Sequence, residues 1–289
     1  MRTDFEYYAP ETIEEALALL EKYGKEAKIL AGGTDLLVDM RERKFRPVAV
    51  IDIKRIKELG DLTYEEGRGL SIGATVTYSQ ILANPDIRTR YPALWEAVRT
   101  IADEIIRMRA TLVGNICTSS PAADTAPALL IYDAVVETAS KKGGRKIPIE
   151  KFFVGVKKNT LDTGELVVRV FIPDPPKDAK GTYLKAMRVW SEDLALVGVA
   201  ALVADNGRDV RLAYASVAPT PVRVREAEEI FKSDGDIRVK IEKAVELAEA
   251  GVAPISDVRA SREYRLHLVR TFTRRALTTL FGVEQYATA

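Results

Sequence analysis

A polar, glycine-containing stretch at residues 111–127, TLVGNICTSSPAADTAP, places the strongest constraint on how this chain can fold. It has no regular apolar period, and it lies between two segments of helical character at 92–108 and 125–130. A loop of this length in a compact domain is usually functional or disordered. Apolar residues are threaded through it, which argues against disorder. We therefore expect an ordered loop, whose hydroxyls, amide and carboxylate suit a polar, phosphorylated ligand.

The overall composition is that of an ordinary water-soluble protein. The 289 residues are 47% hydrophobic and 29% charged, which is enough for two or three sub-domains with their own cores. The net charge of +1 gives no reason to expect nucleic acid or an anionic membrane as a partner. No apolar run reaches ~18 residues and the first ten residues do not resemble a signal peptide, so we expect a cytoplasmic protein without a membrane span.

The single cysteine, Cys117, and the single histidine, His267, limit the chemistry of this chain. One cysteine excludes an intrachain disulfide and any zinc or Fe–S site built from several cysteines of this chain. The two residues are far apart in the sequence, so a Cys–His nucleophilic pair is not expected. No catalytic residue and no metal site is predicted. Charged residues are plentiful and Asn and Gln are scarce, which is typical of a heat-adapted protein.

Residues 1–55 are predicted to form a small α+β unit. Helices are expected at 12–24 and 36–43, and strands at 27–31 and 48–53. The strand at 27–31 runs into Gly32-Gly33, and two glycines after a strand mark a sharp turn whose backbone can approach a ligand. A purely structural turn is the alternative, because the G-x-G-x-x-G fingerprint of dinucleotide-binding proteins is absent.

Two further regions follow, a central α+β region at 56–174 and a C-terminal one at 178–289. The central region is expected to contain a hairpin at 62–64 and 70–72, helices at 77–82, 92–108 and 125–131, and strands at 134–139 and 165–172. A proline-rich linker at 173–176 precedes strands at 182–189, 196–204 and 210–217 and helices at 223–232, 237–250 and 261–280. The fold class is therefore α+β, ending in a three-stranded antiparallel sheet packed on a helical group.

Several polar residues in the 111–127 stretch, and two arginines just before it, each have two possible roles. Asp124 is either the N-cap of the following helix or an acceptor for a ribose or ribityl hydroxyl, and the two roles are compatible. Asn115 is either a turn residue or part of a ligand-binding turn at Gly114. Arg107 and Arg109 are either solvated cations at a helix end or contacts to a phosphate or a partner protein.

Three short motifs resemble the flavin-binding motifs of molybdenum hydroxylases: AGGTD at 31–35, TLVGN at 111–115 and SPAAD at 120–124. From end to end the chain is similar to the separate FAD-binding medium subunit of that family, known from aerobic carbon monoxide dehydrogenase and from the flavin domain of xanthine dehydrogenase. The resemblance implies a two-part FAD-binding domain of the vanillyl-alcohol-oxidase/PCMH type, formed by 1–55 and 56–174, and a C-terminal flavin-subunit domain at 178–289.

The same resemblance implies roles for individual residues. FAD would lie between the first two regions, with its pyrophosphate near the backbone at Gly32-Gly33 and at Gly114-Asn115. Asp124 would hold a sugar or ribityl hydroxyl, so replacing it by alanine should weaken FAD retention without unfolding the chain. Leu194 would lie against the isoalloxazine ring. The complete implied set of cofactor-binding residues is Ala31, Gly32, Gly33, Thr34, Asp35, Thr111, Gly114, Asn115, Ser120, Asp124 and Leu194.

The resemblance also implies partners: an Fe–S small subunit that delivers electrons to the flavin, and a large subunit that carries the molybdenum cofactor. Electrons would leave for an external acceptor. A stand-alone flavin oxidoreductase of the same fold is one alternative. A scaffold subunit without flavin is another, because Val113 stands where relatives carry glycine, and a β-branched residue would be strained there if φ were positive.

Overall fold

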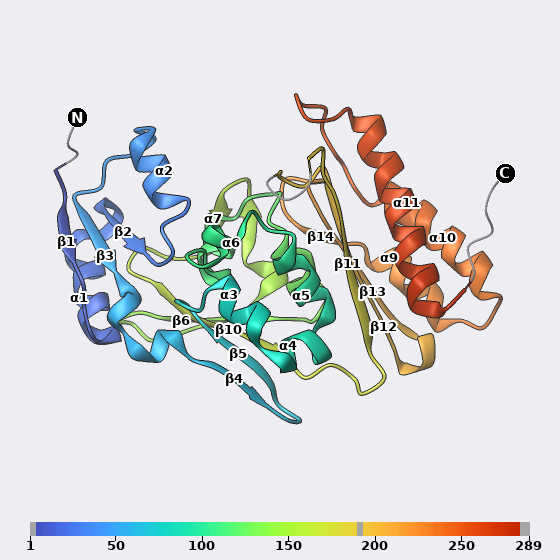
Figure 1. The fold of residues 1–289 in the computed structure, drawn as a ribbon, viewed down its shortest axis with the longest axis horizontal. Coiled ribbons are helices and arrows are strands. Elements are labelled where there is room, and N and C mark those ends of the chain that lie inside the picture. Colours follow the sequence, from blue (N-terminus) through green and yellow to red (C-terminus); the bar gives the residue numbers. More distant parts are fainter. Residues whose placement is uncertain (1–3, 190–192, 284–289) are drawn as a thin grey trace.

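Three main β-sheets, each with its own helices, follow one another along the long axis of the molecule (Figure 1). The computed structural model describes residues 4–189 and 193–283. Short 3-10 turns connect several elements, at Gly24–Glu26, Ile53–Arg55, Lys57–Gly60, Ile149–Lys151, Asp205–Gly207 and Ile230–Lys232. None of the helices in the described ranges is long and apolar enough to cross a membrane.

The N-terminal part is a three-stranded parallel sheet with strand order β1-β3-β2. Its elements are β1 (Glu6–Tyr8), α1 (Ile13–Tyr23), β2 (Ala27–Leu30), α2 (Leu36–Arg41) and β3 (Ala49–Asp52). The predicted β-α-β arrangement is confirmed, and β1 is an additional strand. The central strand β3 is buried throughout, because neighbouring strands and α1 cover it.

The central part is a five-stranded antiparallel sheet with strand order β4-β5-β10-β6-β7. Its strands are β4 (Leu62–Glu65), β5 (Gly69–Gly73), β6 (Val135–Ala139), β7 (Lys146–Pro148) and β10 (Leu166–Pro173). The chain between β5 and β6 forms the helices α3 (Tyr78–Ala83), α4 (Pro85–Arg90), α5 (Pro92–Arg99), α6 (Glu104–Arg107), α7 (Leu112–Thr118) and α8 (Thr125–Ile131). A two-stranded ribbon, β8 (Phe153–Gly155) and β9 (Lys158–Asn159), completes this part.

The single helix predicted at 92–108 is wrong, because the chain breaks between α5 and α6. Ala102 has a positive φ of 43°, which no helix accommodates. Arg107 stabilises the break by donating hydrogen bonds of 2.7 Å to the carbonyl groups of Ile101 and Ala102. Arg107 therefore has a structural role that neither of its predicted readings included.

The prediction that 111–127 is a loop is also wrong, because α7 occupies seven of its residues. Thr111 caps this helix by accepting a hydrogen bond of 3.0 Å from the backbone N–H of Gly114. Leu112, Val113 and Ile116 are buried on the core side of the helix. Its low content of strong helix formers conceals the helix in the sequence, and burial of these three side chains compensates for the weak propensity.

The C-terminal sheet has four strands in the order β11-β12-β13-β14, one more than predicted. They are β11 (Lys180–Ala186), β12 (Val197–Ala204), β13 (Asp209–Ala215) and β14 (Val222–Arg223), followed by α9 (Arg225–Glu229), α10 (Ile237–Ala250) and α11 (Arg262–Phe281). The predicted helix 223–232 starts later than expected, because Val222 and Arg223 pair with β13.

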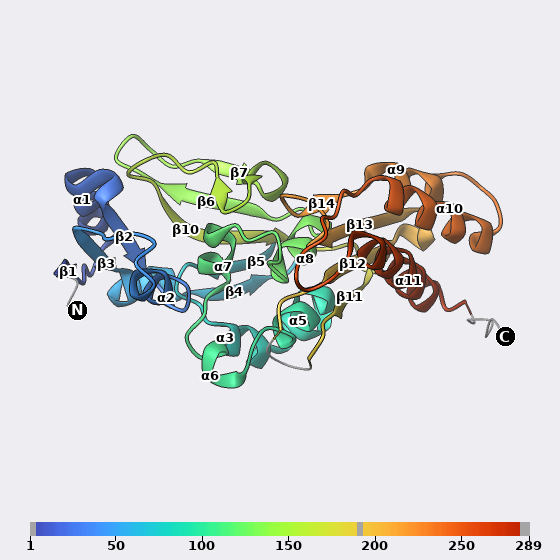
Figure 2. The ribbon, with the colours of Figure 1, turned by 90° about the horizontal axis from the view of Figure 1, so that it is seen from above.

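Both faces of this C-terminal sheet are covered, which places it in the middle of a three-layer arrangement (Figure 2). Ala200 and Leu202 on β12 belong to the core shared with the central part, whereas Val199 and Ala201 belong to the core under α10 and α11. All eight residues of β12 are buried, as expected for a strand that has helices on both faces. The sheet thereby joins the C-terminal helices firmly to α5 and α8. The predicted regions 1–55, 56–174 and 178–289 remain a prediction as domains.

Candidate functional site

The first and second glycine-containing segments lie side by side, although about 75 residues separate them in the sequence. A Cβ atom added to Gly32 would lie 2.2 Å from the carbonyl oxygen of Arg109 and 2.9 Å from the Cα of Ala110. The hydroxyl of Thr118 donates a hydrogen bond of 3.0 Å to the carboxylate of Asp35. The structure therefore brings the turn after β2 against the segment that leads into α7.

The turn after β2 is a genuine glycine turn. Gly33 has a φ of +79°, and a Cβ there would lie 2.8 Å from Cδ1 of Leu30. The backbone N–H of Leu37 donates to the carbonyl of Gly33 at 3.0 Å, so the helical turn of α2 starts directly at the glycine. Ala31 and Thr34 flank the glycines and are half-buried. The turn thus ends in a helix N-terminus, where partial positive charge favours an anion.

The second segment is different, because Gly114 is not at a bend. Gly114 lies in the first turn of α7, and its φ is not positive. Val113 beside it is helical and buried, so the strain expected for a β-branched residue at this position is absent. Valine at position 113 is therefore compatible with the local backbone.

The polar side chains of the second segment bind mainly to the protein itself. Thr125 donates a hydrogen bond of 2.9 Å to the amide oxygen of Asn115 and so links α8 to α7. Ser120 accepts a hydrogen bond of 3.3 Å from the backbone N–H of Ala122. Asn115 is therefore more than a turn residue, because it fixes the packing of two helices.

Asp124 is buried, with 6% of its surface exposed, and is surrounded by donors. It accepts a hydrogen bond of 2.7 Å from the hydroxyl of Tyr183 and forms an ion pair of 3.0 Å with Lys185. Lys185 also donates to the carbonyl of Thr100 at 3.0 Å. Asp124 occupies the N-cap position of α8 as predicted, but its carboxylate makes no capping hydrogen bond to this helix. Burial raises the pKa of Asp124, while the Lys185 ammonium and the Tyr183 hydroxyl oppose this shift.

Tyr183 and Lys185 were missed by the sequence analysis, although both contact a predicted site residue. They alternate with Thr182 and Leu184 along β11, so they share the sheet face that packs on α5 and α8. A lysine that follows a tyrosine by two residues on a strand with a buried face is the sequence signal that could have revealed them.

Leu194 lies in the connection that leads into β12. Its side chain is 56% exposed, and its backbone N–H donates to the carboxylate of Asp193 at 3.0 Å. Within residues 4–189 and 193–283, no hydrogen bond or ion pair joins Leu194 to the segments at 31–35 or 111–124. Its predicted contact with the isoalloxazine ring stays a prediction.

Three candidates from the sequence remain: Cys117, His267 and Arg109. Burial raises the pKa of the Cys117 thiol to about 12, which makes it a poor nucleophile. His267 is exposed on α11, in a part of the chain remote in sequence from both glycine segments. Arg109 is exposed, and its backbone rather than its side chain contacts Gly32.

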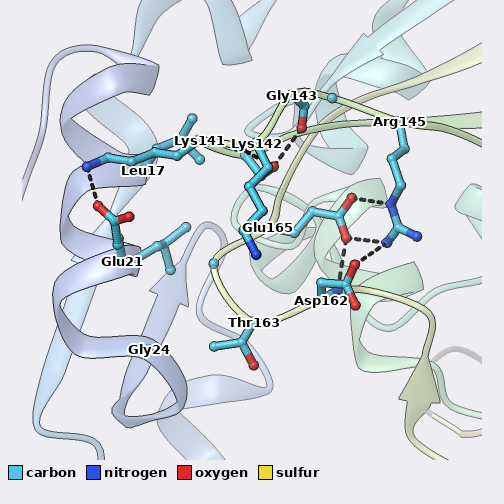
Figure 3. A pocket seen from close by; sticks show the side chains of 14 residues that line it. Leu17, Glu21, Gly24, Lys141, Lys142, Gly143, Arg145, Asp162, Thr163 and Glu165 are labelled. Carbon is cyan, nitrogen blue, oxygen red and sulfur yellow. Dashed lines mark hydrogen bonds and ion pairs between the residues drawn. The ribbon is translucent and has the colours of Figure 1, made fainter.

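A cavity of about 680 Å³ lies elsewhere, between α1 and two loops of the central part (Figure 3). The cavity and the Gly32-Gly33 turn lie at opposite ends of β2. Gly24, which lines the cavity, precedes this strand, and the glycine turn follows it. Arg145 pairs with Glu165 inside the cavity, and Lys141 reaches across to Glu21 on α1. None of the predicted cofactor-binding residues lines this cavity, and its charges largely pair with one another.

The chain matches two family models that together span most of its length. One describes the FAD-binding domain in molybdopterin dehydrogenase and matches residues 3–175. The other describes the CO dehydrogenase flavoprotein C-terminal domain and matches residues 182–280.

Individual relatives agree with these models. The chain is 36% identical over 277 residues to the putative xanthine dehydrogenase FAD-binding subunit of Escherichia coli K12, with 94% of each chain covered. It is 32% identical over 281 residues to the carbon monoxide dehydrogenase medium chain of Hydrogenophaga pseudoflava, with 96% of this chain and 97% of the relative covered. The solved carbon monoxide dehydrogenase of H. pseudoflava that lacks the Mo-pyranopterin moiety superposes with a TM-score of 0.92 at 31% identity, over 99% of this chain and 100% of that chain.

Proposed function

Because the chain belongs to the family of FAD-binding medium subunits of molybdenum hydroxylases, we propose that it holds FAD across the paired segments at 31–35 and 111–124 and transfers electrons within a larger complex. The observation that carries this proposal is the contact of the Gly32 backbone with the backbone of Arg109 and Ala110. It sets two backbone segments beside each other at the start of two helices, α2 and α7.

The residues of these segments fit a diphosphate-containing cofactor. Gly32 and Gly33 keep the backbone free of side-chain bulk, and Gly114 does the same at the start of α7. The N-termini of α2 and α7 offer backbone N–H groups to the pyrophosphate, in place of the second tight bend that the sequence suggested. Thr34, Asp35 and Thr111 border the same place and would orient the cofactor through hydrogen bonds.

Asp124 can connect the predicted cofactor segment to the C-terminal sheet and, at the same time, accept a hydrogen bond from a hydroxyl of the cofactor. Each of its oxygens accepts one hydrogen bond from the protein, and a carboxylate oxygen can accept a second. The bonds to Tyr183 and Lys185 hold the carboxylate in one orientation, and Lys185 also anchors it to the end of α5. The ion pair therefore connects the C-terminal sheet to the predicted cofactor segment.

Bound FAD would supply a redox centre that exchanges electrons singly or in pairs, which the side chains of this protein cannot do. In this proposal an Fe–S small subunit and a large subunit with the molybdenum cofactor accompany the chain, and an external acceptor takes the electrons. We assign the fold to the vanillyl-alcohol-oxidase/PCMH type of FAD-binding domain and the complex to the cytoplasm. The exposed Leu194 is then available to cover the isoalloxazine ring.

Two alternatives receive no support from a specific observation. The flavin-free scaffold was motivated by Val113, and its unstrained helical backbone removes that motive. A stand-alone flavin enzyme would need groups for substrate chemistry, but the described residues of both glycine segments offer only binding groups and a buried ion pair.

The visible spectrum of the purified chain, with and without added FAD, tests the cofactor assignment. We expect a yellow protein that holds about one FAD per chain, and a Gly33→Val variant that loses most of it because of the positive φ and the nearby Leu30. Gly67→Val is the matched control, because Gly67 also has a positive φ, of 78°, but no atom lies within 4 Å of its Cβ position. A colourless chain that takes up no FAD would overturn the assignment.

Co-expression with neighbouring gene products tests the electron-transfer role. We expect a complex in gel filtration that contains iron, acid-labile sulfide and molybdenum, whose flavin is reduced when the substrate of the large subunit is added. A chain that remains alone and turns over a substrate by itself would favour the stand-alone enzyme.

A further inference from the structure

One face of α7 is turned toward the glycine turn that follows β2. Thr118, at the end of this helix, donates a hydrogen bond of 3.0 Å to the carboxylate of Asp35 in that turn. Asn115 lies three residues earlier and shares the same face, because side chains three or four residues apart in a helix lie one above the other. The opposite side of α7 carries its buried residues, Leu112, Val113 and Ile116. Asn115 therefore borders the place where the two predicted cofactor segments meet.

The carboxamide of Asn115 has an acceptor end and a donor end, and the protein uses only the acceptor end. The hydroxyl of Thr125 donates a hydrogen bond of 2.9 Å to Oδ1 of Asn115. The Asn115 side chain, which is half-buried, forms no other hydrogen bond within residues 4–189 and 193–283. The oxygen is therefore committed to α8, and the NH₂ group, which can only donate, is the end that remains for a ligand.

Thr125 is well suited to hold the amide in this orientation. It is the first residue of α8, and 0% of its surface is exposed. Because the side chain is β-branched and closely packed, its hydroxyl stays in one position. Burial also keeps solvent from competing for the bond to Asn115, which strengthens it. Without this hydroxyl, the amide could turn its oxygen instead of its NH₂ group toward a ligand.

The donor end of the amide matches the chemistry of a diphosphate. The phosphate oxygens carry negative charge and only accept hydrogen bonds, and bonds to a charged acceptor are stronger than those between neutral groups. An amide oxygen turned the same way would repel them. The orientation of this one amide therefore decides whether Asn115 favours or opposes an anion between the two segments.

We infer that Thr125 is a positioning residue, which sets the Asn115 carboxamide so that its NH₂ group donates to the diphosphate of the cofactor. Thr125 acts through Asn115 and not by direct contact, since it is fully buried. The inference rests on the proposed function, in which FAD lies across the segments at 31–35 and 111–124. It adds that α8 contributes to anion recognition by α7.

FAD binding to the full-length chain, followed by the quenching of flavin fluorescence, tests the inference. Thr125→Val keeps the shape of the side chain and removes the hydroxyl, so the Kd of FAD should rise about tenfold. Thr125→Ser keeps the hydroxyl, and its Kd should stay within about twofold of the wild-type value.

A double-mutant cycle separates positioning from a general weakening of the fold. Asn115→Ala removes the amide and should raise the Kd of FAD about thirtyfold. In that background, Thr125→Val should change the Kd by less than about twofold, because no amide remains to be oriented. If Thr125 only stabilised the packing of α8 on α7, its loss would raise the Kd by the same factor in both backgrounds.

Thr273→Val is the matched control. Thr273 is also completely buried, and its hydroxyl shares a hydrogen bond of 3.0 Å with Tyr214, but both residues belong to the C-terminal part. This variant should lower the melting temperature, as Thr125→Val does, and leave the Kd of FAD unchanged.

The possible failures are distinguishable. A Kd that Thr125→Val leaves unchanged, or raises equally in the Asn115→Ala background, would overturn the positioning role while the cofactor assignment stands. A wild-type chain that binds no FAD would overturn the proposed function, and this inference with it.

Discussion

The two glycine-containing segments look alike in the sequence but use their glycines differently. The first segment needs both of its glycines. A Cβ at Gly32 would collide with the backbone of Arg109, and Gly33 has a positive φ. At Gly114 the chain is simply the first turn of a helix, and the neighbouring Val113 is buried there without strain. A glycine in a ligand-binding motif can thus mark either a tight turn or a helix start, and both expose backbone N–H groups to a ligand.

The largest effect is expected at Asp124, where the second segment depends on a buried charge. Asp124→Ala leaves the Lys185 ammonium buried without its partner, so the free energy of unfolding should fall by about 3–5 kcal/mol. The resemblance predicts weaker FAD retention without unfolding, and the buried ion pair adds this expected loss of stability to that prediction. Urea denaturation measures the loss. The double variant Asp124→Ala/Lys185→Met should recover part of it, and a loss equal to the sum of the single variants would show that the two side chains are not coupled.

A smaller but substantial effect is expected at Gly32, in the first segment. Gly32→Ala forces a methyl group to within 2.2 Å of a backbone oxygen, which cannot move away as a side chain could, so we expect a loss of about 2–3 kcal/mol together with weaker FAD binding. Gly60→Ala is the control, because its Cβ would make only an ordinary contact of 3.6 Å with Thr75. Equal stability of the two variants would mean that the first segment is not tightly packed.

Val113→Gly introduces the glycine that the family resemblance implies at this position, and it tests whether the second segment is stabilised as a helix. It removes a buried side chain and adds a flexible residue to α7, so we expect the free energy of unfolding to fall by about 2 kcal/mol. Val239→Gly, at a comparable early position of α10 but 68% exposed, should cost about 0.5 kcal/mol. If the Val113→Gly variant were more stable than the wild-type protein, the helix start at 111–115 would be incorrect.

The smallest effect is expected for Gly114→Ala. Its methyl group would approach the Thr111 hydroxyl to 2.8 Å, so the hydroxyl that caps α7 has to shift, and the weaker cap is offset by the higher helix propensity of alanine. The change in the free energy of unfolding should stay below about 1 kcal/mol, as thermal melting with and without FAD can measure. A loss as large as that of Gly32→Ala would abolish the distinction between the two segments.

Much of the fold was predictable because local patterns encode it. The hairpin of β4 and β5, the helices α10 and α11 and the β-α-β unit around Gly32 follow from periodicity, caps and turns over short stretches. The exceptions are elements that tertiary contacts create. β14 has only two residues and exists because β13 offers a free edge, and α7 forms because the core buries its apolar side.

The sequence by itself determined the tight turn at Gly32-Gly33 and which family the chain resembles. Those properties depend on residue identity and short spacing. Only the tertiary structure decided that Gly32 lies against Arg109, that Asp124 pairs with Lys185, and that Thr125 donates to Asn115. Each of these joins residues that no local pattern relates, because partners that meet only after folding are selected by burial and by the need to satisfy every buried charge.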